Sequence, residues 1–441
     1  MASFSQFNLN DNLLAAIEKI GFTEPTKAQL ELIPAVLSGQ NIVGQSQTGS
    51  GKTHVFLISL FEKINVSNNK TQVVISAPSR ELVTQIYNAA TDLNKNLDQQ
   101  FTIQLLVGGV DRDKSIKKIS STNPQIVIGT PGRLKDMIKN NFLIVNQVDF
   151  FVIDEADMTL DMGFLEDVEF ISSSLPKEVQ LLVFSATIPN ELSVFLKKYL
   201  DVTKIKNIKN ETVIADTISN WLLPTRSADN NQMILKLLNR QMPFLTLIFV
   251  NTKERAQQLY DFLSEQKINV AQIHGNIQPR QRKKTMNEIK KLEYQVIVAT
   301  DLAARGIDIQ GVAEVINDEI PKQSDFFIHR VGRTGRNGQK GLAITLVGPD
   351  DYAKVENLEN LGIKFETKQF KGDQLIDAKN YKQRTNRRLK QSALEGRVLG
   401  DINKKKQTVK PGYKKRIKKT IDMENQKNRR ISQRQTRKTH K

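Results

Sequence analysis

Short apolar runs recur along the first 370 residues of this 441-residue chain, and they restrict its fold more than any other feature. Most runs are rich in Val, Ile and Leu, end at a small or polar residue, and precede a stretch with helical spacing. Continuous apolar strands that alternate with helices are typical of parallel sheets covered on both faces. The predicted strands are Asn41–Gly44, Gln72–Ala77, Ile103–Val107, Gln125–Gly129, Phe150–Ile153 and Gln180–Ser185 in a first series, and Leu245–Val250, Val270–Ile273, Gln295–Ala299, Glu314–Asn317 and Ala343–Val347 in a second.

The two series of strands predict two α/β lobes. A polar stretch from Thr203 to Pro224 interrupts the rhythm between them, and 441 residues exceed one ordinary domain. We expect a first lobe at 1–208, a linker at 209–224, a second lobe at 225–366 and a tail at 367–441.

The tail holds the net charge of the chain. Residues 371–441 contain 24 Lys and Arg against six Asp and Glu, which accounts for the whole net charge of +18. Few large apolar residues lie among them, so we predict a basic, mostly disordered segment. Such a tail either keeps the chain soluble or tethers it to nucleic acid, because clustered cations displace counterions from phosphates.

Composition excludes several classes of protein. The chain has no cysteine, and its four histidines lack metal-ligand spacing, so we expect no disulfide, no thiol chemistry and no zinc. Met1–Asn12 has no basic segment followed by an apolar one, and no apolar run approaches the roughly 18 residues that cross a bilayer. We expect a cytoplasmic monomer with no membrane contact.

A phosphate-binding pattern follows the predicted strand Asn41–Gly44. The backbone N–H groups from Thr48 to Lys52 can hold phosphates at a helix N-terminus, where Lys52 adds positive charge and the Thr53 hydroxyl can bind magnesium. The usual first glycine of this pattern is Ser46 here. The candidate nucleotide site comprises Ser46, Gln47, Thr48, Gly49, Ser50, Gly51, Lys52 and Thr53.

Clustered carboxylates follow the predicted strand Phe150–Ile153. Asp154 is the expected magnesium ligand, and Glu155 is the expected base or orienting group for an attacking water. For Asp157 we favour a cap or a contact between lobes over direct chemistry. A phosphate cradle together with a strand-end Asp-Glu pair predicts magnesium-dependent hydrolysis of a nucleoside triphosphate.

Arginines alternate with glycines in the segment from His329 to Arg336. Guanidinium groups fit γ-phosphate oxygens, so the segment predicts an anion clamp that requires the two lobes to close around the nucleotide. A surface loop held in salt bridges is the alternative.

In their order these segments resemble the DEAD-box RNA helicases, and the resemblance runs from Phe4 to about Glu366. It implies two tandem RecA-like lobes of the P-loop NTPase type, with ATP and Mg2+ as cofactors and RNA as partner. Gly21–Gln29 resembles the family's adenine-reading motif, which implies nucleotide contacts for Phe4, Thr26 and Gln29. The amide of Gln29 can pair with both N6 and N7 of adenine.

Further segments resemble the family's RNA-binding and coupling motifs. The resemblance implies contacts to the RNA backbone for Pro78, Arg80, Gly109, Thr130, Gly132, Arg133 and Thr300. It implies coupling between ATP and RNA for Ser185, Thr187, Asp157 and His329, and nucleotide contacts for Gly306 and Asp308. The implied catalytic residues are Lys52, Asp154, Glu155, Arg333 and Arg336, of which the two arginines meet the γ-phosphate.

Three positions depart from the family pattern. Ser79 replaces threonine but keeps the hydroxyl, and Val331 replaces isoleucine. Pro279 stands where glutamine is common, with Gln278 one position earlier, so the role of that glutamine is open because proline offers no amide. This pattern and the basic tail are similar to the cold-shock members of the family in low-GC Gram-positive bacteria.

The resemblance implies an RNA-dependent ATPase that unwinds short duplexes locally and remodels RNA or RNA–protein complexes. An ATP-regulated clamp or annealing factor would use the same residues, and a DNA-directed ATPase is a third alternative, which the 2′-hydroxyl of RNA would discriminate. Ribosome assembly, RNA decay and cold adaptation are all compatible with the sequence, with ribosomal or RNA-decay factors as partners.

Overall fold

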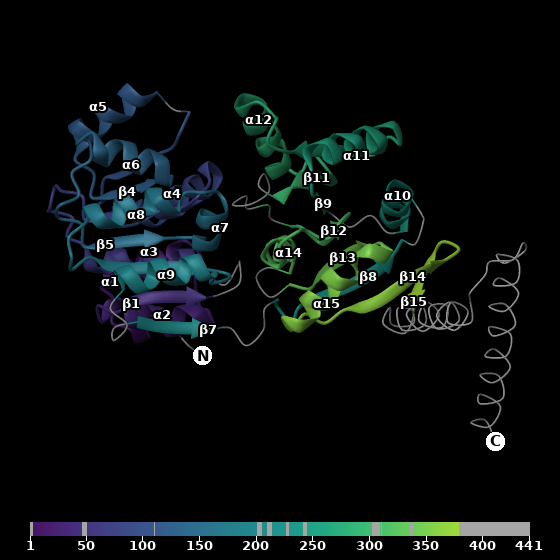
Figure 1. Cartoon of the computed structure of the whole chain (residues 1–441). Coiled ribbons are helices and arrows are strands. Elements are labelled where there is room, and N and C mark those ends of the chain that lie inside the picture. Colours follow the sequence, from purple (N-terminus) through teal and green to yellow (C-terminus); the bar gives the residue numbers. More distant parts are fainter. Residues whose placement is uncertain are drawn as a thin grey trace, which may run out of the picture. The chain divides into compact units, whose positions relative to one another are not determined.

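The computed structural model describes residues 3–45, 51–109, 111–200, 205–209, 214–225, 229–240, 245–301, 309, 311–335 and 339–378. Their strands form two separate sheets (Figure 1). The first sheet has seven strands in the order β3-β4-β2-β5-β6-β1-β7, and all neighbours are parallel. Its strands are β1 Asn41–Gln45, β2 Val73–Ser76, β3 Ile103–Leu106, β4 Ile126–Gly129, β5 Phe150–Ile153, β6 Gln180–Ser185 and β7 Ile205–Lys209.

The second sheet has eight strands in the order β10-β11-β9-β12-β13-β8-β14-β15, and the pairs from β10 to β8 are parallel. Its strands are β8 Ile218–Pro224, β9 Thr246–Val250, β10 Val270–Ile273, β11 Val296–Thr300, β12 Glu314–Asn317, β13 Gly341–Val347, β14 Glu366–Lys371 and β15 Gln374–Asp377. Gly372, with a φ of 64°, lies in the turn between the last two strands.

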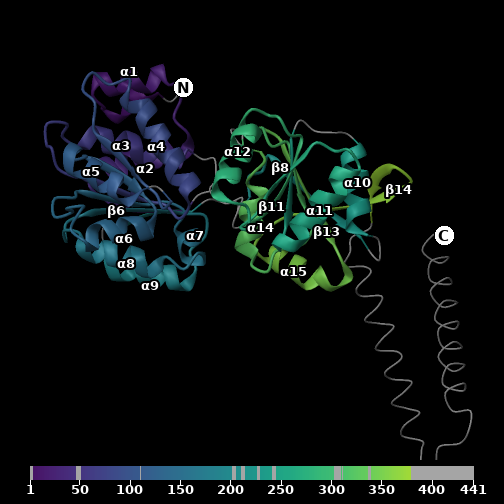
Figure 2. The ribbon, with the colours of Figure 1, turned by 90° about the horizontal axis from the view of Figure 1, so that it is seen from above.

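Helices cover both faces of the first sheet. Val152 of β5 packs into the core beside α1, α2, α3 and α4, whereas its neighbours Phe151 and Ile153 pack into the core beside α6, α8 and α9. Figure 2 shows these two groups of helices on opposite sides of the strands. Because successive side chains of a strand point to opposite faces, burial on both faces requires the continuous apolar runs of the sequence.

The helices have the following bounds. Those around the first sheet are η1 Phe4–Phe7, α1 Asp11–Lys19, α2 Lys27–Leu37, α3 Lys52–Lys63, α4 Arg80–Asn94, α5 Arg112–Thr122, α6 Pro131–Lys139, α7 Ala156–Asp161, α8 Leu165–Ser174 and α9 Asn190–Tyr199. Those around the second are α10 Asn230–Arg240, α11 Lys253–Glu265, α12 Pro279–Lys290, α14 Ser324–Val331, η4 Pro349–Asp351 and α15 Tyr352–Asn360. None of the described helices is both long and apolar enough to span a bilayer.

The prediction of two parallel α/β lobes is confirmed. All eleven predicted strands are present, and the bounds of each lie within two residues of the prediction. Strand β8 lies within the range that the sequence assigns to the linker, and β14 and β15 lie mainly within the range that it assigns to the tail.

The amino-acid sequences of β8, β14 and β15 are only weakly typical of strands. In β8, polar Ser219 and Asn220 interrupt the apolar run, and Trp221 is half-buried with the guanidinium of Arg240 5.5 Å from its ring centre. In β14 and β15 every side chain is half-buried or exposed, because the two strands lie at the border of the sheet. Polar strands of this kind lack the apolar content by which buried strands are recognised.

Close packing at the end of β4 makes Gly129 a sensitive position. A Cβ atom on Gly129 would lie 2.9 Å from the Leu106 carbonyl oxygen and 2.9 Å from Leu134 Cγ. We expect Gly129→Ala to lower the free energy of unfolding by about 1–3 kcal/mol, because backbone and core must shift. The matched control is Gly275→Ala, since a Cβ there meets nothing within 4 Å. Calorimetric melting of both variants checks this, and equal midpoints would contradict it.

Candidate functional site

The functional segments of the first lobe follow the carboxyl ends of neighbouring strands. Gln45 of β1 pairs with Ser185 of β6. Ser76 of β2 pairs with both Gly129 of β4 and Ile153 of β5. Open α/β sheets bind ligands outside the carboxyl ends of their strands. The predicted nucleotide, acidic and RNA segments therefore all follow strands at the carboxyl-terminal side of the sheet.

Gln29 ties the predicted adenine motif to the phosphate loop. Its side chain is fully buried, and its Oε1 accepts a 2.8 Å hydrogen bond from the backbone N–H of Thr26. The Thr26 hydroxyl accepts in return from the backbone N–H of Gln29, so the two residues form a capping box at the start of α2. The Gln29 Nε2 donates to the Gly51 carbonyl at 3.4 Å. The sequence prediction of an adenine contact missed this capping role, although Thr-x-x-Gln before an apolar run signals it.

Two aromatic contacts lie close to this motif. Phe4, the predicted nucleotide contact, is 4% exposed and packs edge-on against Phe7, inside the core beside α1 to α4. The ring of Phe22 lies 4.4 Å from that of His54 on α3. Burial lowers the pKa of His54 to about 4, so its imidazole is neutral at physiological pH. Both contacts support the helices that carry Gln29 and Lys52.

Asp154 and Glu155 lie at the end of β5 as predicted. Asp154 is 4% exposed, and burial, with a further contribution from Glu155, raises its pKa to about 7, whereas the buried Lys52 acts in the opposite direction. Glu155 has a left-handed φ of 49°, and its Oε2 is buried without a hydrogen-bond partner among the described residues. Carboxylate and hydroxyl oxygens suit Mg2+, so Asp154 and Thr53, in the first turn of α3, fit a magnesium site.

Asp157 is the centre of a buried hydrogen-bond network. Its Oδ2 accepts from both the backbone N–H and the hydroxyl of Thr187 at 2.9 Å, and it lies 3.3 Å from His329 Nε2. Ser185 accepts from the Asp157 backbone N–H at 3.0 Å and donates to the Thr187 carbonyl at 2.6 Å. The structure thus brings together all four residues that the sequence assigns to coupling.

The charge of Asp157 depends on those donors. Burial by itself raises the pKa of this carboxyl, but His329 and the hydrogen bonds from Thr187 outweigh burial and hold the pKa well below its usual range. Glu155, Asp157 and His329 also bring one ligand atom each within 4.8 Å of one another, a grouping that spacing along the chain does not reveal. Since Thr187 and His329 already occupy the Asp157 carboxylate, the group serves as a hydrogen-bond network.

Most of the predicted RNA contacts of the first lobe lie near the N-termini of helices that follow the carboxyl ends of the same strands. Buried Pro78 precedes α4, and exposed Arg80 begins it. The guanidinium of Arg80 lies so close to Gly109 that a Cβ there would come within 2.6 Å of Nη1. Thr130 caps α6, and Gly132 is exposed in its first turn.

Arg133 and Thr300 are both largely covered. Arg133 donates to the Ser115 hydroxyl at 3.2 Å and lies 3.6 Å from the Asp136 carboxylate, so part of its guanidinium faces the protein. Thr300 ends β11 in the second lobe and is 9% exposed.

Arg330 supports the fold of the second lobe. It is 1% exposed, and it donates to both carboxylate oxygens of Asp301, to Asn251 Oδ1 and to the Glu319 carbonyl. Arg333 is also buried, and its Nε donates to the His329 carbonyl at 3.2 Å. The prediction of a clamp from alternating arginines therefore does not extend to Arg330, because its guanidinium donates four hydrogen bonds within the second lobe.

Several predicted residues lie outside the described part of the chain. They are Ser46, Gln47, Thr48, Gly49 and Ser50 of the phosphate loop, Gly306, Asp308 and Arg336 of the second lobe, and the tail from residue 379 onward.

Two family models match the chain. The model described as DEAD/DEAH box helicase matches residues 26–195, and the one described as Helicase conserved C-terminal domain matches residues 229–338. Among solved structures, S. cerevisiae Dbp5 bound to RNA and ADP BeF3 matches with a TM-score of 0.76 at 29% identity, over 84% of this chain and 96% of that chain. A structure of Mss116p bound to ssRNA and AMP-PNP matches with a TM-score of 0.74 at 26% identity, over 91% and 84% respectively. The two sheets are thus a pair of RecA-like helicase lobes.

Proteins of similar sequence narrow the assignment from helicases in general to one family. The DEAD-box ATP-dependent RNA helicase CshB of Listeria monocytogenes is 44% identical over 94% of this chain and 95% of its own length. CshB of Bacillus subtilis is 41% identical over 94% of both chains. The chain belongs to the DEAD-box ATP-dependent RNA helicases.

The contact between Gln29 and Gly51 predicts the effect of a single methyl group. Gly51 has a φ of +86°, and a Cβ there would lie 2.9 Å from Gln29 Nε2. We expect Gly51→Ala to weaken ATP binding roughly tenfold or more, because Gln29 loses its buried partner. Titration with a fluorescent ATP analogue measures this. Gly163→Ala is the control, since its φ is +75° and its Cβ meets nothing within 4 Å. Equal affinities of both variants would contradict the argument.

Because the imidazole of His54 is neutral in the folded protein, we expect the folded state to lose stability in acid. Its pKa is about 4 in the folded protein, against the ordinary pKa of 6.5 for a histidine side chain in water. The folded state therefore binds fewer protons, so its stability is full above pH 6.5 and falls as the pH drops toward 4, by up to about 3 kcal/mol. We expect His54→Gln to reduce this dependence. Melting midpoints of both proteins at about pH 7.5 and about pH 5 test it, and parallel shifts would argue against it.

Proposed function

We propose that this protein is an RNA-stimulated ATPase that separates short RNA duplexes locally. The observation that carries the proposal is the Asp157 network, which joins the acid after Glu155 to Thr187 and to His329 of the arginine segment. A carboxylate whose partners lie on two other segments responds to any change in its distances to them. Nucleotide chemistry beside Glu155 can therefore alter the grip on RNA.

The nucleotide would be held at the edge of the first sheet. Lys52 and the Gly51 turn would receive its phosphates at the start of α3, and Asp154 with Thr53 would hold Mg2+, which neutralises phosphate charge when bound. Glu155 would orient the attacking water from the end of β5. Arg333 and Arg336 would stabilise the charge that develops on the γ-phosphate.

The RNA would be held by its backbone. Arg80, Gly109, Thr130, Gly132 and Thr300 present small side chains, N–H groups or a guanidinium, which suit contacts to phosphate and ribose and do not read sequence. Bending a bound strand disrupts one or two base-pair steps at a cost of about 1–4 kcal/mol, borrowing stacking values of DNA. This energy melts short duplexes and leaves long ones intact, so processivity is low.

The basic tail would act as a tether to structured RNA, because it carries the whole net charge of +18. We place the activity in the cytoplasm, in a monomer, with ribosomal and messenger RNA as candidate substrates.

Glu155→Gln tests the chemical step. We expect the variant to lose RNA-stimulated ATP turnover by roughly 10²–10⁴-fold while it keeps binding ATP, since only the carboxylate that orients the water is removed. Steady-state hydrolysis with structured RNA, with DNA and without nucleic acid measures this. Glu178→Gln is the matched control, because Glu178 is exposed in the turn before β6, at the opposite end of that strand from Ser185. Equal rates of ATP hydrolysis with and without RNA would contradict the proposal.

Duplex length tests the mechanical step. With ATP, the purified protein should separate a labelled RNA duplex of about five base pairs far faster than one of about forty. Equal rates would contradict local strand separation. Retention of the short duplex in an ATP-dependent complex would identify a clamp instead.

A further inference from the structure

Glu314 places a carboxyl group inside the second lobe, at the start of the interior strand β12. The residue is 3% exposed, and its Oε1 is buried without a hydrogen-bond partner among the described residues. The neighbouring strands set Thr246 and Leu342 beside it, and neither of these side chains ionises. A charged carboxylate in such a place costs free energy unless a cation compensates it.

The compensating cation is Arg240, the last residue of α10. Its Nη2 lies 3.7 Å from Glu314 Oε1, which is close enough for charge attraction but too far for a hydrogen bond. Its guanidinium also lies 5.5 Å from the ring centre of Trp221 on β8. The other charged side chains that the surrounding elements carry toward this end of the sheet are exposed; they are Asp216 before β8, Lys236 of α10, Asp261 and Glu265 of α11, and Lys340 before β13.

Helix α10 is attached to the same strand at its other end. Asn230, the first residue of the helix, donates to the Asp318 carbonyl at 3.0 Å and to Asp318 Oδ1 at 3.1 Å. Glu314 and Asp318 are four residues apart on extended backbone, so their side chains point to the same face of the sheet, about 13 Å apart along the strand. The 11 residues of α10 span about 16 Å. The helix therefore lies along β12, with Asn230 fixed at one end and Arg240 beside Glu314 at the other.

The two ends of this attachment differ in how their carboxyl groups are satisfied. Asp318 also accepts from Arg255 of α11 at 2.7 Å and 3.0 Å, so it has a bidentate cationic partner. Glu314 Oε1 has no such bond within the described residues. Burial raises the pKa of Glu314 to about 7, whereas Arg240 acts in the opposite direction. The Glu314 end of α10 therefore gains or loses a proton around neutral pH.

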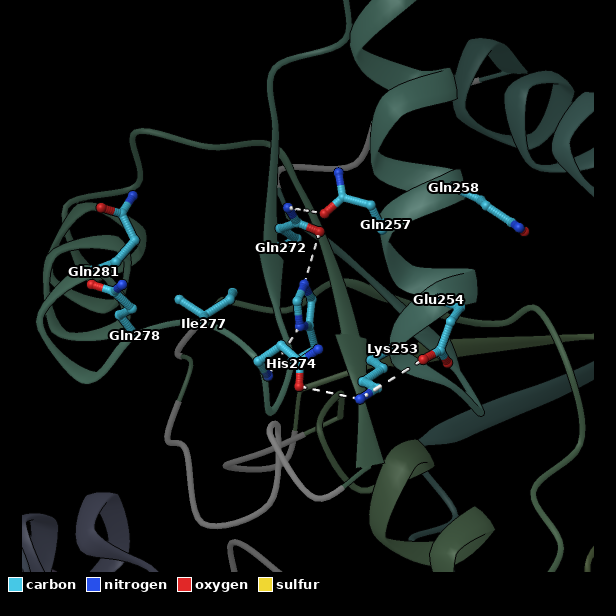
Figure 3. Close-up of a pocket in the computed structure, with 10 residues that line it drawn as sticks. Lys253, Glu254, Gln257, Gln258, Gln272, His274, Ile277, Gln278 and Gln281 are labelled. Atoms are coloured by element: carbon cyan, nitrogen blue, oxygen red, sulfur yellow. Dashed lines mark hydrogen bonds and ion pairs between the residues drawn. The ribbon is translucent and has the colours of Figure 1, made fainter.

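His274 is a further titratable side chain of the second lobe, and it lies at the other end of the sheet. It follows the carboxyl end of β10, where its Nε2 lies 3.2 Å from Gln272 Oε1, and Gln272 donates to Gln257 (Figure 3). Burial lowers the pKa of His274 away from neutral pH. Its ionisation is thus separate, in place and in pH range, from that of Glu314.

We propose that Glu314 is a pH sensor of the second lobe: ionisation of its carboxyl group loosens the end of α10, and pairing with Arg240 limits the loosening. When the carboxyl group carries a proton, it is neutral and stays buried at little cost. When the proton leaves, the charge must either draw Arg240 closer or reach water through opening of the last helical turn. Since the folded state holds this proton more tightly than the unfolded chain, its stability is full below about pH 4.5 and falls as the pH rises through about 7.

Hydrogen exchange of α10 tests the proposal in the full-length protein. Amide protection in the peptide that contains Arg240 is measured by mass spectrometry at about pH 6 and about pH 8, and is corrected for the intrinsic exchange rate. With a pKa of about 7 when buried and 4.5 when exposed, we expect protection to fall about tenfold more in the intact protein than in Glu314→Gln. Other titrating groups, such as Asp154 and His274, affect both proteins alike, so the difference belongs to Glu314.

Arg240→Gln tests the compensating cation. Without the guanidinium the buried charge costs more, so we expect protection to fall by more than about tenfold between the two pH values. The double variant Glu314→Gln with Arg240→Gln should behave as Glu314→Gln alone, because a cation without a titrating partner has no pH-dependent effect. The matched control is Glu254→Gln, which removes an exposed glutamate 3.9 Å from Lys253 and should keep the fall seen in the intact protein (Figure 3).

Three outcomes would overturn the proposal. An equal change of protection in the intact protein and in Glu314→Gln means that this carboxyl group does not control α10. An unchanged fall in Arg240→Gln means that Arg240 does not compensate the charge. A fall in the double variant as large as in the intact protein assigns the effect to another group.

Discussion

Parallel pairing of strands that are buried on both faces is the constraint on which the rest of this structure depends. Phe151 and Val152 enter opposite cores, so a shift of one residue in the register of β5 would exchange their environments. The same shift would move Asp154 away from the level of Phe184, the residue before Ser185. With both faces covered, only the ends of the strands are free for chemistry. The hydrophobic pattern therefore sets the positions of the polar residues.

The protein shifts the pKa values of two buried aspartates, Asp154 and Asp157, in opposite directions. Asp157 receives donors from Thr187 and His329, which stabilise its charge. Asp154 accepts from the Glu155 backbone N–H, and burial together with its acidic neighbour opposes its charge. A carboxylate that is poorly stabilised gains most from a nearby cation. Three residues apart along the chain, one carboxylate has its charge opposed by burial and an acidic neighbour, and the other has its charge stabilised by a network of hydrogen bonds.

The sequence predicts the elements of this fold better than its contacts. The run Phe150–Ile153 is recognisable because it is apolar on both faces, whereas β8 and β14 carry polar residues and are not. Positions that depend on local spacing, such as those of the two acids directly after β5, are also predictable. Contacts across the chain are not, since Asp157 meets His329 172 residues away.

The same limit applies to groups that the protein itself saturates. Nothing in the spacing of the arginines separates Arg330, whose guanidinium is bound within the second lobe, from Arg333. For Gln29 the Thr-x-x-Gln pattern of the sequence signals the bond to Thr26, but only the fold reveals the second contact, from its Nε2 to the Gly51 carbonyl.

The strand β8, absent from the predicted set, gives the molecule an intrinsic optical probe. Trp221 is the only tryptophan of the chain, and the guanidinium of Arg240 lies over its ring. Its emission depends on that cation and on the half-buried position of the indole. Fluorescence excited at the red edge of the protein spectrum, where tyrosine does not absorb, therefore arises from the second lobe alone. Unfolding of that lobe can be followed without a label and separately from the first.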